Sequence, residues 1–184
     1  MPPKPGNKRV SLGGASVVIP RRWLTSGYHG LPSTLAFPIV FYSSARMTTR
    51  CSKPTQTLCT SGNWFPRDVV TPTNGVLVSW VDDEDGAPDI QWPRLPGRVT
   101  KIHHHIAKVE VGTNDGGCPR GAAREVAAYI RIPTKPIKVG GRSQYTGSRL
   151  AMTACIGPHA SSTDRFAVSR MLHSLRIHPK HWIR

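Results

Sequence analysis

Residues 150–177 read LAMTACIGPHASSTDRFAVSRMLHSLRI, and more independent sequence signals agree in this stretch than in any other. The run 150–156 is short and mostly apolar, which is typical of a buried strand. Gly157-Pro158 follows it directly, and this pair favours a turn because the interior of a helix would not tolerate it. The sequence therefore predicts a strand that ends at Ile156.

A helix is predicted after this turn. Ser161 and Asp164 have capping-box spacing, at which a hydroxyl and a carboxylate can satisfy the first amides of a helix. Apolar residues then recur at i, i+3, i+4 and i+7, at Val168, Met171, Leu172 and Leu175. Polar residues take the other face, and Pro179 is expected to end the helix.

Further strands are predicted upstream, in short apolar or alternating runs that end at turn residues. These runs are 15–19, 35–42, 75–81, 99–111 and 125–132. Pro38 indicates a sheet edge or a bulge, and the run 99–111 predicts strands joined by a bulge or one turn after Ala107-Lys108. Strands that precede a final helix predict an α+β fold, with a mostly antiparallel sheet of about six strands and the C-terminal helix packed on it.

We expect one domain over residues 15–177, because a chain of 184 residues can bury a core without help from metal. Residues 1–14 are rich in proline, glycine and basic side chains, which predicts a disordered basic tail. Residues 178–184 are expected to form a C-terminal tail. Residues 48–74 have no sustained period and predict a long loop stapled by its cysteines.

The chain carries 25 lysines and arginines against 10 aspartates and glutamates, a formal net charge of +15. The basic residues are spread along the chain, which predicts a basic surface for an anionic partner. That partner is an envelope polymer, an anionic lipid surface or a nucleic acid. No window approaches 18 uninterrupted apolar residues, so we expect no transmembrane segment. We expect a monomer.

Four cysteines at long, irregular spacings predict two disulfides, and the spacing leaves all three pairings open. They are Cys51, Cys59, Cys118 and Cys155. The alternative is four buried thiols in a reducing compartment. Zinc is not predicted, because no C-x-x-C pair is present. If the cysteines pair, we expect an export signal upstream of Met1 and a location in the cell envelope or outside the cell; otherwise we expect the cytoplasm.

His103 and His105 are the weak candidates for metal ligands. Alternate residues of a strand share a face, so these two side chains of the HHH run are placed to share a metal. A half-exposed strand with polar side chains explains them equally well, and no third ligand is implied. The sequence therefore predicts neither a metal site nor a cofactor.

Five carboxylates gather in a turn of this basic chain, at Asp82, Asp83, Glu84, Asp85 and Asp89. A calcium loop of the EF-hand type requires a glycine at position 6 between oxygen ligands. Placing Gly86 there puts Val81 at position 1 and Trp92 at position 12, and neither side chain supplies an oxygen. We therefore interpret the cluster as a solvated turn and leave its role open.

No catalytic residue is predicted. The chain contains no nucleophile elbow, phosphate-binding loop, dinucleotide fingerprint or zinc-protease helix. We expect a non-catalytic binding or structural domain of the cell envelope or exterior, with a basic surface. The alternative is a cytoplasmic domain that binds nucleic acid, although no helix-turn-helix, zinc finger or recurrent aromatic platform accompanies the charge.

Four motifs carry a resemblance to a known family. They are SVVIPRRW at 16–23, GVLVSW at 75–80, ACIGP at 154–158 and MLHSLRI at 171–177. Together they resemble uncharacterised exported or lipid-anchored proteins of high-GC Gram-positive bacteria, whose members begin with an export signal that is not visible after Met1. The last strand and helix also resemble the end of the PsbP-like α/β/α sandwich. The resemblance implies an antiparallel sheet flanked by helices and a binding role.

Overall fold

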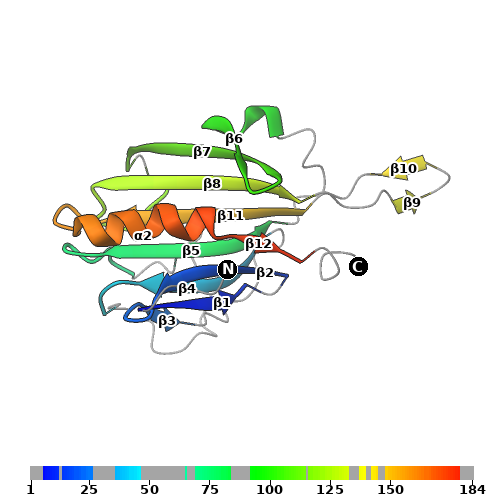
Figure 1. Cartoon of the computed structure of the whole chain (residues 1–184). Coiled ribbons are helices and arrows are strands. Elements are labelled where there is room, and N and C mark those ends of the chain that lie inside the picture. The colour runs from blue at the N-terminus through cyan, green and yellow to red at the C-terminus, as the bar shows by residue number, and fades with distance from the viewer. Residues whose placement is uncertain are drawn as a thin grey trace.

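The computed structural model of the protein describes residues 6–12, 14–26, 36–46, 65, 69–83, 92–114, 116–132, 137–139, 142–144 and 148–178 (Figure 1). The elements within these residues are β1 (Asn7–Ser11), β2 (Ala15–Pro20), β3 (Leu24–Ser26), β4 (Ala36–Ser43), β5 (Val76–Asp83), η2 (Trp92–Arg94), β6 (Arg98–Ile102), β7 (His105–Thr113), β8 (Arg124–Ile132), β9 (Ile137–Val139), β10 (Arg142–Gln144), β11 (Ser148–Ile156), α2 (Ser162–His173) and β12 (Arg176–Ile177).

The main sheet contains seven strands in the order β3-β4-β5-β11-β8-β7-β6, and every neighbouring pair is antiparallel. The predicted α+β class, the mostly antiparallel sheet and the C-terminal helix are confirmed. The predicted number of strands is wrong for three reasons: the run 15–19 forms β2, which belongs to a second sheet, residues 99–111 contribute to two strands, and the three-residue β3 has no periodic pattern. The β9–β10 ribbon projects from the main body (Figure 1).

A second, smaller sheet has the order β1-β2-β12. All five residues of β1 pair with β2, so the prediction of a disordered tail is wrong for this segment. The composition was misleading because Val10 is the one apolar residue of β1 and the other four residues are polar or charged. Pairing with β2 and the packing of Val10 on the core hold the strand in place, and the following Leu12 is 1% exposed.

Helix α2 and the small sheet lie side by side on one face of the main sheet, which we call the near face (Figure 1). One apolar cluster fills the space between the two layers, with members from Leu12 in the N-terminal hairpin to Leu175 after the helix. Trp80 of β5 is fully buried there, and its Nε1 donates to Met171 Sδ at 3.2 Å. The helix therefore packs on the sheet through its apolar face, as predicted.

The two ends of α2 differ in how well the sequence predicted them. Ser161 is the N-cap, and its side chain accepts from the amide of Asp164, which confirms the predicted start. The predicted end is wrong: α2 stops at His173, before Pro179, which lies outside the described residues. Ser174 caps the helix, and its Oγ donates to the Met171 carbonyl and accepts from the Val18 amide. This contact with β2 stops the helix early.

Two strand predictions hold in detail. The β4 register shifts between Pro38 and Val40, which confirms the predicted bulge. Strand β8 has the alternating pattern that favoured a strand over an alanine-rich helix, with Ala128 and Ile130 on the near face. In both places the local pattern agreed with the final packing.

Candidate anion-binding face

The layer formed by α2 and the small sheet is strongly basic. The described residues of 6–26 and 158–178 include seven lysines or arginines and one carboxylate. That carboxylate, Asp164, is 5% exposed. The seven are Lys8, Arg9, Arg21, Arg22, Arg165, Arg170 and Arg176. We call the six arginines of this set the basic face.

The single carboxylate of this layer is occupied by its own neighbours. Asp164 Oδ1 accepts from Arg22 at 2.6 Å and from Trp23 Nε1 at 3.1 Å. Its Oδ2 accepts from the Ser161 hydroxyl at 2.8 Å. These contacts tie the turn after β2 to the first turn of α2. They engage one arginine and leave the positive charge of the remaining five uncompensated by Asp164.

A pocket of about 370 Å³ lies between the β1–β2 hairpin and α2. Its lining includes Asn7, Arg21, Arg22, Thr163, Ala167 and Arg170. The backbone oxygen of Asn7 accepts from Arg21 Nε at 3.3 Å, and its side-chain oxygen accepts from Arg170 at 3.4 Å. One residue thus positions two guanidinium groups that line the same pocket, and a guanidinium fork is well matched to phosphate or carboxylate oxygens.

A second pair of arginines lies on the small sheet. Arg9 donates to the Ser16 hydroxyl at 3.1 Å and to the Ser174 carbonyl at 3.2 Å. Burial, and to a lesser extent the nearby charge of Arg176, lower the pKa of Arg9 below its usual value. The fold therefore holds two like charges close together, and a bound anion would relieve their repulsion.

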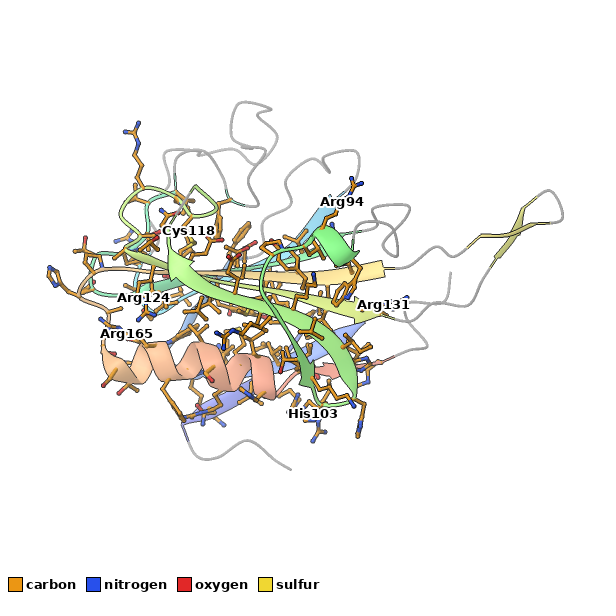
Figure 2. The ribbon with its side chains drawn as sticks, turned by 90° about the horizontal axis from the view of Figure 1, so that it is seen from above. Arg94, His103, Cys118, Arg124, Arg131 and Arg165 are labelled. Carbon is orange, nitrogen blue, oxygen red and sulfur yellow. A yellow bond between two sulfur atoms is a disulfide. The ribbon has the colours of Figure 1, made fainter. Side chains whose placement is uncertain are left out.

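Phe166 is the exposed apolar side chain of this layer. Its position on α2 is opposite the buried stripe that contains Val168 and Met171, and it is 62% exposed. The guanidinium of Arg170 lies over its ring, 5.1 Å from the centroid. Arg165 extends from the first half of the same helix (Figure 2). The ring is therefore flanked by positive charge.

The structure does not bring the predicted histidine pair to one strand face. Ile102 pairs with His105, and His103 and His104 form the two-residue turn between β6 and β7 (Figure 2). His103 has φ 53°, a turn conformation. Residues 99–111 therefore hold two strands with one turn between them, as predicted, but the turn lies at His103-His104 and not at Ala107-Lys108. No group of three or more His, Cys, Asp or Glu side chains suited to a metal occurs in the part of the chain that the structure describes.

The cysteine prediction is confirmed for one pair. Cys118, in the loop between β7 and β8, is bonded to Cys155 of β11, with a Cα–Cα distance of 5.5 Å. Cys51 and Cys59 lie outside the described residues, as does most of the predicted loop 48–74. Asp82 and Asp83 end β5, and the rest of the acidic cluster, residues 84–89, is also outside the described residues.

Sequence reasoning assigned no site to Asn7, Arg21, Arg170 or Phe166. Two signals were available. The chain has no aspartate or glutamate before Asp68, and the exposed positions of α2 carry no carboxylate. These signals indicate a positive surface, but they do not indicate that the N-terminal hairpin and the helix form one pocket.

No described helix has the length and apolar character needed to cross a membrane. Comparison of the chain with models of protein families, with curated proteins and with solved structures finds no match in any of the three.

Proposed function

We propose that the protein is a non-catalytic binding domain of the cell envelope or exterior, and that its basic face binds an anionic partner. One observation carries this proposal: the six arginines of the basic face share a layer whose one described carboxylate is buried. A surface of one sign attracts opposite charge and accelerates association with it. The proposal assigns no catalytic residue and no cofactor.

The Cys118–Cys155 bond supports the location outside the cytoplasm, because disulfides persist in oxidising compartments. We also infer that the protein belongs to the exported or lipid-anchored family that its motifs resemble, and that its fold is PsbP-like. The antiparallel sheet with a C-terminal helix on its near face supports that inference. A cytoplasmic nucleic-acid-binding domain is the competing function, and the same experiment tests it.

The experiment compares two double charge reversals of equal size. Arg165→Glu with Arg176→Glu alters the basic face outside the pocket, and Arg98→Glu with Lys101→Glu alters exposed residues of the edge strand β6. Binding to polyglycerophosphate, to vesicles that contain phosphatidylglycerol and to duplex DNA is measured as salt is raised. We expect the first variant to lose roughly tenfold or more in affinity for its anionic partner, and the second to lose little.

Equal losses in the two variants would show that net charge alone drives binding, and the proposed face would be wrong. Tight binding to DNA alone, with four free thiols in the purified protein, would establish the nucleic-acid function instead. Thermal unfolding of both variants shows whether each substitution leaves the fold intact.

A further inference from the structure

We infer that the pocket between Arg21 and Arg170, together with the neighbouring ring of Phe166, is a binding site for the phosphoryl head group of an anionic phospholipid at a bilayer surface. This inference rests on the proposed function and specifies its partner. It is drawn from three features of the basic face: a pocket with positioned guanidinium groups, an exposed aromatic ring beside it, and the absence of exposed carboxylate from α2.

Arginines that can bind a phosphodiester are among the residues that line the pocket. Arg21 and Arg170 both contact Asn7, although Asn7 and Arg170 are 163 positions apart in the sequence. The shared contact holds the two cations on one pocket before a ligand arrives, so less conformational entropy is lost on binding. Arg22 and Thr163 also line the pocket, with the Arg22 guanidinium already paired with Asp164. A phosphoryl group can accept hydrogen bonds from Arg21, Arg170 and the Thr163 hydroxyl.

The ring of Phe166 indicates an amphipathic ligand instead of a purely polar one. It is an exposed position of α2, and Arg170 connects it to the pocket because Arg170 lines the pocket and its guanidinium lies over the ring. A soluble phosphorylated molecule would leave the ring in water. A bilayer would bury the ring at the depth of the acyl chains while the arginines remain at the head groups.

The charges along α2 agree with an orientation in which Phe166 enters the bilayer and the arginines remain at the head groups. Arg165 and Arg170 flank Phe166, and Asp164, the one carboxylate of α2, is buried and paired with Arg22. Each basic residue near an anionic membrane surface contributes about a fivefold increase in binding, and burial of a phenylalanine ring about tenfold or more. Stacking of a nucleic-acid base is less well supported, because single-strand readers use successive aromatic rings and the Arg170 guanidinium already lies over this one.

The experiment measures the partition of the full chain onto vesicles of equal parts phosphatidylglycerol and phosphatidylcholine, with phosphatidylcholine vesicles as the neutral reference. We expect Phe166→Ser to lower partition onto the anionic vesicles about tenfold, and Arg21→Gln with Arg170→Gln to lower it roughly 25-fold. The matched controls are Val99→Ser, an exposed apolar residue on β6, and Arg98→Gln with Lys101→Gln on the same strand. We expect them to stay within about twofold of wild type.

Two further variants guard against loss of the fold. Phe166→Leu keeps the apolar bulk, and Arg21→Lys with Arg170→Lys keeps the charge, so each should recover most of the binding that Phe166→Ser or the double glutamine variant loses. If Phe166→Ser binds anionic vesicles as wild type does, the inference is overturned. It is also overturned if soluble polyphosphate or DNA binds as tightly as the vesicles and depends on Arg170 but not on Phe166, since the ligand is then a soluble polyanion.

Failure of this inference is distinguishable from failure of the proposed function. If the charge reversal at Arg165 and Arg176 abolishes vesicle binding while the pocket and ring variants bind normally, the basic face is the binding surface and the lipid site is wrong. If none of these variants changes binding more than the β6 controls do, both proposals are wrong.

Discussion

The two faces of the main sheet are buried in different ways. Along β5 and β11, alternate residues point to opposite faces, so Trp80 and Met152 lie on the near face and Ser79 and Thr153 on the far face. The near face meets α2 and the small sheet through one continuous apolar cluster. The same two strands therefore contribute to a hydrophobic core on one side and to a more polar surface on the other.

The far face contains buried polar and charged side chains beside two small apolar clusters. Lys108 is buried, and its Nζ donates to the Leu95 carbonyl at 2.7 Å. Arg149 is also buried, with its guanidinium 5.9 Å from the centre of the Tyr129 ring. At one end of this face the Cys118–Cys155 bond closes a loop over the sheet. The comparison shows that apolar packing stabilises the near face, whereas a covalent bond and polar contacts contribute on the far face.

The largest effect is expected from the far-face disulfide. Replacing Cys118 and Cys155 by alanine opens a link across 37 positions, which should lower the free energy of unfolding by roughly 4 kcal/mol in the chain-entropy model. Urea unfolding of the oxidised protein and of the double variant gives this difference. A loss below about 1 kcal/mol would mean that the far face does not depend on its covalent bond.

Leu172→Ala tests the near face. Leu172 is 5% exposed in the apolar cluster, so truncation should lower the free energy of unfolding by roughly 2–5 kcal/mol through lost burial and a residual cavity. Ser169→Ala, at an exposed position of α2, is the control and should change stability little. A change well under 1 kcal/mol at Leu172 would show that the helix does not pack as described.

Asp164→Ala tests whether a polar contact also stabilises the near side of the main sheet. The substitution removes the acceptor of Trp23 and Arg22, so we expect a loss of about 2 kcal/mol, measured by chemical denaturation. Asp164→Asn should lose less, because an amide oxygen can still accept from Trp23 Nε1. Equal losses in the two variants would indicate that the charge pairing with Arg22 dominates.

The smallest effect is expected from pH at the β6–β7 turn. Burial first, and then the neighbouring charges of His104 and His103, lower the pKa of His105 below 6.5. The unfolded chain therefore binds a proton more readily, and stability should fall as pH drops below 6.5 towards the folded pKa. His105→Gln should flatten this part of the pH profile of Tm, by no more than about 2 °C. An unchanged profile would contradict the prediction.

Local sequence patterns were sufficient to predict the parts of the fold that depend on near neighbours. Periodicity and a capping hydroxyl were sufficient to predict β11, the start of α2 and the apolar face of the helix. Alternation predicted β8 although its alanines favour a helix. The even number of cysteines predicted a disulfide, but not that Cys118 is the partner of Cys155. The periodic and capping signals succeed because each one describes contacts within a few residues.

The remaining features depend on contacts between distant parts of the chain. Strand β1 forms because β2 supplies its hydrogen-bonding partner, and α2 ends early because Ser174 contacts Val18. The candidate site likewise combines the N-terminal hairpin with the helix, through Asn7 and two arginines from distant parts of the chain. Such contacts have no local pattern, since their free energy is gained only when the layers pack together. The sequence therefore determined the positive charge and the main elements, and tertiary packing decided where that charge forms a pocket.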